Sequence, residues 1–345
     1  MTQSTPTQTA LVVGATGGIG GEVARLLLAR GWRVRGLARN PQTAAAGAFG
    51  LAQIDWRQGD AMDAASVVAA AQGCELIVHG ANPPAYHNWA GTVLPMLEST
   101  IVAAKAAGAR ILFPGTIYNF GPDAFPVLSE TSPQRPLTRK GALRVAMEQR
   151  LAQAAADGTP VLIVRAGDYF GGHTRGSWLG QGMIQAGKPV SVVLNPSPRG
   201  VGHAWAYLPD LALAMVRLIE RAEALDAFCV VHFRGHWLED GGEMARAVRR
   251  AAGGRAWIIP FPWPLAHVLA PFQEMMRELL EMRYLWREPL RLDNAKLVGL
   301  LGEEPHTPLD EAVRASLIGL GCLPSPAQSA AAPRLSAPGR TTSAA

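Results

Sequence analysis

Short apolar runs alternate with helical patterns along the first half of the chain. Runs of strand length, several of them apolar throughout, cover Ala10–Val13, Arg33–Leu37, Leu76–Gly80, Arg110–Phe113 and Val161–Arg165. Unbroken apolar runs are typical of parallel strands that are covered on both faces. Helices are expected between them, at residues 18–30, 64–72, 90–107 and 140–156. This alternation predicts an α/β fold with a doubly wound parallel sheet and right-handed crossovers.

The second half of the chain follows a looser pattern. Glycines interrupt residues 171–187, a strand is expected at 190–194, and helices are expected near 208–222, 239–252 and 272–287. We therefore predict one domain at residues 9–166 and a smaller C-terminal substrate lobe at residues 167–323, interleaved with the sheet. The apolar segment 257–272 is broken by four prolines and is expected to be a substrate lid or a core-packing loop. Residues 1–8 and 324–345 have the composition of disordered tails.

Composition and charge exclude several classes of protein. The net charge of +5 is small for 345 residues and the basic residues are dispersed, so no nucleic-acid partner is expected. The sequence contains no long uncharged apolar run, so no membrane span is expected. The N-terminus is polar, so no signal peptide is expected either. Three widely spaced cysteines fit a reducing compartment and predict a cytoplasmic protein. His232 and His236 lack a clear third ligand, so no metal is expected.

The strongest local signal is a glycine-rich turn between the first strand and the first helix. The segment Leu11–Gly21 reads LVVGATGGIGG, and an amphipathic helix follows it. Glycines at this spacing allow a tight turn, a close approach of backbone N–H groups to a pyrophosphate, and close packing of the helix on the strand. The helix N-terminus adds partial positive charge. We expect a dinucleotide to be bound here by Gly14, Thr16, Gly17, Gly18, Ile19 and Gly20.

The end of the second predicted strand bears on which dinucleotide is bound. The segment 33–41 carries no acidic residue to accept hydrogen bonds from a ribose 2′-hydroxyl, and Arg39 instead offers a guanidinium to a 2′-phosphate. This pattern favours NADP over NAD, although Arg39 could also be a solvated loop residue and NAD stays possible. Asp60 follows a third predicted strand, where it could accept from the adenine amino group, cap the next helix, or do both.

These motifs resemble the short-chain dehydrogenase/reductase superfamily, in its extended or atypical NAD(P)-dependent epimerase/dehydratase branch. The resemblance covers about residues 10–250. It rests on GATGGIG at 14–20, ARNP at 38–41, GDAMD at 59–63, VHGAN at 78–82, FPGTIYNFG at 113–121, SETSPQRP at 129–136, VRAGDYFG at 164–171 and HAWAYLPDLALA at 203–214. It implies a Rossmann-like domain that binds a nicotinamide cofactor, with Ala81 among the small residues placed over the cofactor.

The family pattern also implies a catalytic set, from which this sequence departs. In the family a Ser or Thr ends the fourth-strand motif and a Tyr-x-x-x-Lys pair follows on the next helix. Thr116 matches the Ser/Thr position, but Lys140 stands at the tyrosine position and Arg144 at the lysine position. Arg144 could still hold the ribose. Lys140, if desolvation and Arg144 lower its pKa, and Tyr118 are the alternative candidates for the catalytic acid.

Two functions stay open at this point. The first is an NAD(P)-dependent oxidoreductase or epimerase/dehydratase-like enzyme that exchanges hydride with a carbonyl or secondary alcohol of a small-molecule substrate. The second is a non-catalytic NAD(P)-binding regulator or sensor, which the missing tyrosine would allow. Asp168 and His173 could line the substrate pocket, and Asp210 is expected to cap a helix. An apolar aromatic lining is suggested by Trp178, Trp205, Trp237 and Trp263. A homodimer is possible.

Overall fold

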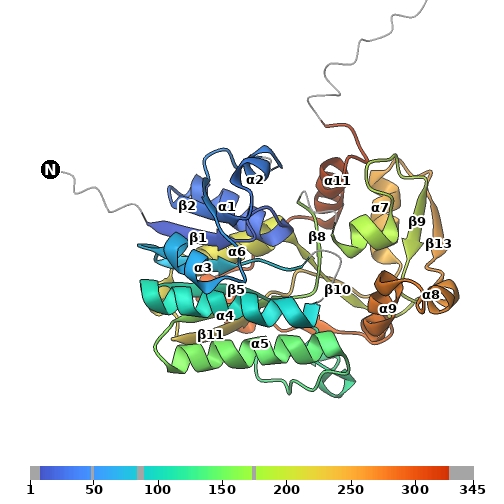
Figure 1. Ribbon diagram of the computed structural model, residues 1–345. Coiled ribbons are helices and arrows are strands. Elements are labelled where there is room, and N and C mark those ends of the chain that lie inside the picture. Colours follow the sequence, from blue (N-terminus) through green and yellow to red (C-terminus); the bar gives the residue numbers. More distant parts are fainter. Residues whose placement is uncertain (1–7, 48–49, 84–88, 173–175, 326–345) are drawn as a thin grey trace, which may run out of the picture.

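A seven-stranded sheet forms the centre of the molecule (Figure 1). The computed structural model describes residues 8–47, 50–83, 89–172 and 176–325. The strand order is β11-β7-β5-β4-β1-β2-β3, and every neighbouring pair is parallel. The strands are β1 (Thr9–Val13), β2 (Arg33–Ala38), β3 (Asp55–Gln58), β4 (Leu76–His79), β5 (Arg110–Thr116), β7 (Val161–Ala166) and β11 (Phe228–His232). The predicted doubly wound parallel sheet is confirmed.

Helices cover both faces of this sheet and create two separate cores. Leu11 of β1 belongs to the core under α3, α4 and α5, whereas its neighbour Val12 belongs to the core under α1, α6 and α10. Both faces are apolar for this reason, and the strands lack the alternation of a half-exposed sheet. The helices are α1 (Gly18–Ala29), α3 (Ala64–Ala71), α4 (Trp89–Ala107), α5 (Arg139–Ala156), α6 (Leu208–Ile219) and α10 (Ala295–Leu301), and α2 (Pro41–Gly47) packs beside β3.

A smaller lobe lies beyond the carboxyl ends of the central strands, on the right in Figure 1. It contains the sheets β12-β10-β8 and β13-β9, and the short pair β14-β6 lies at its border. Its strands are β8 (Asp168–Phe170), β9 (Val192–Asn195), β10 (His203–Tyr207), β12 (His236–Leu238) and β13 (Trp257–Pro260); the border pair is β6 (Val127–Leu128) and β14 (Arg291–Leu292). Its helices are α7 (Glu243–Ala251), α8 (Trp263–Leu269), α9 (Glu274–Glu281) and α11 (Leu309–Gly319).

The segments α6, β11 and α10 belong to the part of the chain assigned to the C-terminal lobe, and they complete the central sheet and its cover. Other details differ from the sequence-based expectations. The segment 257–272 forms β13 and α8 where a loop was expected, and residues 272–287 form α9 and a separate short 3-10 helix. The predicted tails lie outside the described residues, except for residues 8, 324 and 325.

Asp210 does not cap α6. It lies in the first turn of α6, and its carboxylate accepts hydrogen bonds from the backbone N–H (2.6 Å) and the hydroxyl (2.8 Å) of Thr307. The capping position belongs to Tyr207, whose side chain makes no capping hydrogen bond. Asp210 therefore ties α6 to the chain segment before α11.

A buried ion pair fixes α5 against the central sheet. Arg165 on β7 contacts the Glu148 carboxylate through Nη2 at 2.6 Å and through Nε at 3.1 and 3.2 Å, and both side chains are almost fully buried. Gln134 donates a further hydrogen bond to Glu148. Since α5 also carries Lys140 and Arg144, this pair sets where those two side chains lie.

Candidate active site

A pocket of about 430 Å³ lies between the carboxyl ends of the central strands and the smaller lobe. The strand ends contribute Thr116, Tyr118, Asp168 and Tyr169, and α5 contributes Arg144. The remaining wall comes from the lobe, the segment after β4 and the start of α4: Asn82, Trp89, Gly167, Gly176, Ser177, Trp178, Gln181, Gly182, Leu194, Phe261, Pro262, Leu265, Ala266, Leu269, Met276 and Leu279. In open α/β sheets this edge is where ligands bind.

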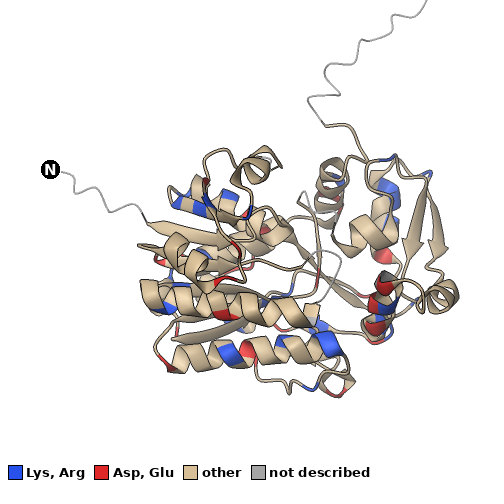
Figure 2. Ribbon diagram, in the orientation of Figure 1, with Lys and Arg blue, Asp and Glu red and all other residues tan. Residues whose placement is uncertain are grey.

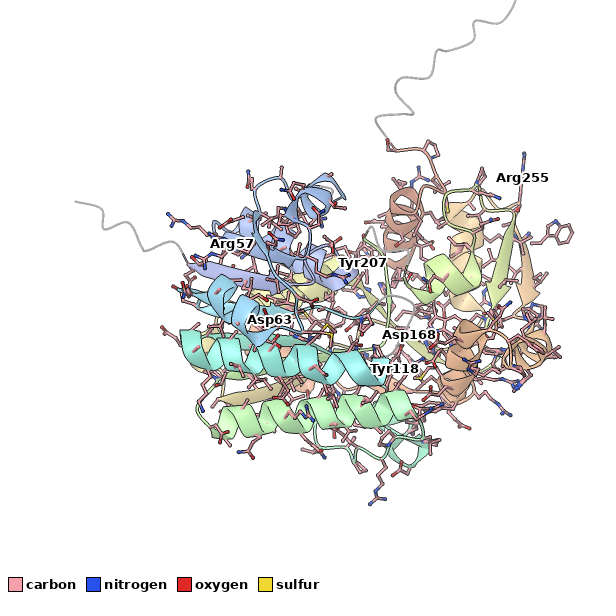
Figure 3. The ribbon with its side chains drawn as sticks, in the orientation of Figure 1. Arg57, Asp63, Tyr118, Asp168, Tyr207 and Arg255 are labelled. Carbon is pink, nitrogen blue, oxygen red and sulfur yellow. The ribbon has the colours of Figure 1, made fainter. Side chains whose placement is uncertain are left out.

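Two predicted site residues come to the pocket from the end of β5. Thr116 is the last residue of the strand, and its hydroxyl accepts a hydrogen bond from the backbone N–H of Tyr118 at 3.3 Å. The Tyr118 hydroxyl donates to Oδ1 of Asp168 at 3.3 Å. Figure 3 shows Tyr118 and Asp168 close together at the junction of the two parts. Both residues therefore line one pocket, and the Tyr118 hydroxyl contacts a carboxylate there.

The Asp168 carboxylate also contacts a histidine that sequence reasoning did not single out. Oδ2 of Asp168 lies 2.8 Å from Nε2 of His203, and both side chains are nearly inaccessible. Nδ1 of His203 lies 3.2 Å from the carbonyl oxygen of Leu285, and its ring stacks on Trp286 at 3.9 Å. Because a carbonyl only accepts, Nδ1 carries a hydrogen. One more proton then lies between Nε2 and Asp168, so the pair has no net charge.

Strand pairing explains why these two residues meet. β8 and β10 pair in parallel with Trp205 opposite Asp168, and His203 is two residues before Trp205 on the same face of β10. The sequence signal was therefore present in the strand-like segment HAWAY, but only the partner strand reveals which acid the histidine faces.

Arg144 reaches the pocket from the side of α5. Its guanidinium lies 5.3 Å from the centre of the Trp89 ring and 5.6 Å from that of Phe113, and its buried Nε has no hydrogen-bond partner among the described residues. Burial, helped by the Arg144 charge, lowers the pKa of His79 to about 3, so His79 is neutral. Nδ1 of that histidine lies 2.7 Å from the Thr100 hydroxyl. A cation with an unsatisfied donor thus lies beside the strand ends.

The Lys140 side chain contacts α9 and does not reach the pocket. Its ammonium lies 2.6 Å from Oε2 of Glu278 and 3.2 Å from that residue's carbonyl oxygen, and its backbone N–H donates to Glu281. Burial lowers the pKa of Lys140, and the carboxylates of Glu278 and Glu281 oppose that shift. Lys140 does not line the pocket. The geometry therefore does not support the predicted role as a proton donor, because the ammonium joins α5 to α9.

The glycine-rich turn has the geometry that the sequence predicted. A Cβ at Gly14 would lie 2.6 Å from the backbone nitrogen of Ala81, and one at Gly20 would lie 2.3 Å from the carbonyl oxygen of Gly14. The helix α1 begins at Gly18, and its N-terminus has no side-chain cap and no acid in its first turn. Its first N–H groups are thus left for an anionic ligand.

The other predicted cofactor contacts surround this turn. Arg39 is exposed just after β2, and Ala81 is half-buried next to Gly14. Asp60 is exposed and accepts a hydrogen bond from the backbone N–H of Met62. The helix cap belongs to Asp63, which accepts from the N–H groups of Ala65 and Ser66, so the expectation that Asp60 caps α3 is wrong.

A family model decides the relationship. The model of the NAD dependent epimerase/dehydratase family matches residues 10–230. The chain belongs to this family. The resemblance inferred from the sequence is thereby confirmed, and the protein is an NAD(P)-dependent epimerase-like enzyme with a nicotinamide cofactor. No curated protein matches the sequence.

Solved structures of sugar-nucleotide epimerases share the fold at low sequence identity. The UDP-Glc/GlcNAc 4-epimerase from Campylobacter jejuni is 17% identical with a TM-score of 0.69, over 91% of this chain and 99% of that chain. The UDP-glucose 4-epimerase from Bifidobacterium longum, in complex with NAD+ and UDP, is 18% identical with a TM-score of 0.67 (91% and 98%). The UDP-glucuronic acid 4-epimerase from Bacillus cereus, in complex with NAD, is 15% identical with a TM-score of 0.71 (91% and 98%).

Some of the other residues that were expected to line the substrate pocket of this epimerase/dehydratase family member do so, and others lie away from it. Asp168 and Trp178 line it, whereas Trp205, Trp237 and Trp263 do not. His173 lies outside the described residues. Among the described residues no group of three or more His, Cys, Asp or Glu could hold a metal ion, and no helix is long and apolar enough to cross a membrane.

Proposed function

We propose that the protein is an NADP(H)-dependent oxidoreductase that interconverts a carbonyl compound and the matching secondary alcohol. One observation carries the proposal: Thr116, Tyr118, Asp168 and Arg144 line a single pocket at the strand ends. This pocket lies beyond the same edge of the sheet as the glycine-rich turn, at the end of β1. The family fixes a nicotinamide cofactor, and the choice of NADP rests on Arg39.

The residues present fit such a cofactor. The uncapped N-terminus of α1 and the close contact between Gly14 and Ala81 suit a pyrophosphate, and Arg39 suits a 2′-phosphate. Arg144, with an unsatisfied Nε–H, would donate to the nicotinamide ribose in place of the family lysine. When bound, the nicotinamide exchanges a hydride with the substrate carbon that carries the oxygen.

Proton transfer falls to Tyr118 in this proposal. Thr116 and Tyr118 hold the substrate oxygen between their hydroxyls, and Tyr118 gives its proton to that oxygen during reduction. The proton held between Asp168 and His203 then returns to the phenolate through the Asp168 carboxyl group. His203 keeps its Nδ1–H on the carbonyl of Leu285, and solvent restores the proton of the pair.

The test measures NADPH oxidation at 340 nm by the purified protein with a panel of aldehydes and ketones. We expect turnover that Tyr118→Phe reduces at least 100-fold while the affinity for NADPH changes by less than threefold, because removing a general acid costs about 10²–10⁴ in rate. Unchanged turnover in Tyr118→Phe would reject Tyr118 as the acid.

The second candidate function is a non-catalytic NAD(P)-binding sensor. It is favoured by one observation, the engagement of Lys140 with Glu278 at the position where the family has its tyrosine. A protein that binds NADPH but oxidises it with no member of the panel would establish this alternative. We also keep two predictions from the sequence, the cytoplasmic location and a homodimer, and light scattering of the purified protein tests the latter.

A further inference from the structure

The charge of the pocket points to its substrate. We infer that the pocket takes an uncharged and largely apolar carbonyl compound or alcohol rather than a sugar nucleotide. This inference rests on the proposed function, and it names the substrate class of the same site. It separates the chain from the UDP-glucose 4-epimerase of Bifidobacterium longum, which shares its fold and whose structure is described as a complex with NAD+ and UDP.

Few charged groups line the described part of the pocket. Among its described lining residues, Arg144 and Asp168 alone are charged. The Asp168 carboxylate is engaged by His203 and Tyr118, and Arg144 lies at the strand ends against Trp89 and Phe113. A diphosphate would bring about two negative charges into a space where, among the described lining residues, Arg144 is the one cation and Asp168 is already paired with His203. Such groups need several charge-assisted hydrogen bonds to offset their desolvation, and among the described lining residues only Arg144 can supply them.

Most polar groups of the pocket lie at the strand ends, and Ser177 and Gln181 of the lobe add two more. Thr116, Tyr118, Asp168 and Asn82 come from the strand ends and the segment after β4. An apolar wall is built by α8, α9 and the connection between β13 and α8, and it presents Phe261, Pro262, Leu265, Ala266, Leu269, Met276 and Leu279. A molecule with one polar end and an apolar body is the complement of this arrangement.

The apolar wall continues to the outside of the molecule. Leu265 lines the pocket and is nevertheless 53% exposed, so it forms part of the rim. Val268, on the same helix, is 66% exposed and does not line the pocket. Figure 2 shows no charged residue on α8, β9 or β13. An apolar molecule therefore meets no charged group on α8 as it enters, and a pocket of about 430 Å³ suits a small one.

The test compares binding of two kinds of probe to the NADP+-bound protein by isothermal titration calorimetry. The apolar probes are 2-heptanone, cyclohexanone and 4-phenyl-2-butanone, and the charged probe is UDP-glucose. We expect saturable binding of at least one ketone and none of UDP-glucose up to 5 mM. Leu265→Glu, which places a carboxylate on the wall, should weaken ketone binding at least tenfold. The matched control Val268→Glu, one turn along α8 and outside the pocket, should change it less than twofold.

The outcomes separate this inference from the proposed function. Tighter binding of UDP-glucose than of every ketone overturns the inference, and so does the absence of binding by all three ketones or equal affinity in Leu265→Glu and the unmutated protein. Ketone binding without NADPH oxidation supports the substrate class and rejects the oxidoreductase. Turnover of a UDP-sugar supports a nicotinamide-dependent reaction and rejects the substrate class.

Discussion

The neutral pair of Asp168 and His203 provides the sharpest test of how Tyr118 works. In the variant His203→Gln, an amide replaces the imidazole, and its N–H can still donate to Asp168. The substitution removes the proton that the imidazole shares with the carboxylate, so Asp168 is left as an uncompensated anion. Its Oδ1 lies 3.3 Å from the Tyr118 hydroxyl. Any negative charge that develops on Tyr118 as it releases its proton is then repelled by the charge of the Asp168 carboxylate.

The geometry sets the size of the effect. Two unit charges 3.3 Å apart repel each other by about 5 kcal/mol at an effective dielectric constant of about 20. This is an upper bound, since a proton in flight leaves only part of its charge behind. If about half of the repulsion acts in the transition state, the loss is about 2–3 kcal/mol, or about 10²-fold in kcat. KM should change by less than threefold, because His203 does not line the pocket.

The assay is steady-state NADPH oxidation with a ketone accepted by the unmutated protein. The double variant Asp168→Asn/His203→Gln carries no carboxylate and should recover about tenfold of the lost kcat, although it removes one more native group. His236→Gln is the control, since His236 is also buried and lies opposite Trp205 on the neighbouring strand, outside this chain of hydrogen bonds. An unchanged kcat in His203→Gln, or a double variant slower than the single one, would refute the electrostatic reasoning.

The remaining predictions concern the cofactor, the α5–α9 contact and stability. Arg39→Ala should weaken NADPH binding at least about tenfold and leave NADH binding unchanged in fluorescence titrations, because a charge-assisted contact contributes about 1.5–3 kcal/mol; equal affinities of the unmutated protein for NADPH and NADH would reject NADP. Lys140→Met should raise KM and leave kcat within about threefold, since it releases α9; a lost kcat at constant KM would restore its catalytic role. Glu148→Gln should lower the free energy of unfolding by about 3–5 kcal/mol in urea titrations, because it leaves a buried guanidinium unpaired, and a loss under 1 kcal/mol would contradict this. Burial lowers the pKa of His79 and His232 from 6.5 to about 3, so the unfolded state binds more protons than the folded state below pH 6.5. The free energy of unfolding should therefore fall as the pH drops from 6.5 toward 3, by about 1.4 kcal/mol per pH unit for each histidine. In urea titrations of His232→Gln, the free energy of unfolding should change less steeply with pH.

Local chemistry made the cofactor turn predictable. Gly14, Gly17 and Gly20 meet a requirement that lies within a few residues of chain: a tight turn packed against a strand end. The unbroken apolar strands were equally clear, because Leu11 and Val12 face two different cores and both must be apolar. The fold class followed from these two local patterns.

The catalytic candidates were harder to place because their roles depend on distant partners. Lys140 and Arg144 are one helical turn apart on α5, and the sequence alone does not show that the first faces Glu278 while the second faces the pocket. His203 escaped notice for a related reason. Its acid is 35 residues away on a parallel strand, and the register of β8 against β10 is fixed only by the packing of the lobe.

Proton transfer by Tyr118 depends, in the proposed function, on where the smaller lobe places Asp168 and His203. In the family pattern both the tyrosine and its lysine belong to one helix of the cofactor domain. Here Tyr118 follows β5 of that domain, whereas Asp168 and His203 belong to the lobe sheet and His203 is stacked on Trp286. A displacement of the lobe would therefore disturb the contact between His203 and Asp168 before it disturbed the glycine-rich turn. Cofactor binding should thus tolerate substitutions in the lobe that stop proton transfer, and this separation is what the His203 variants are designed to detect.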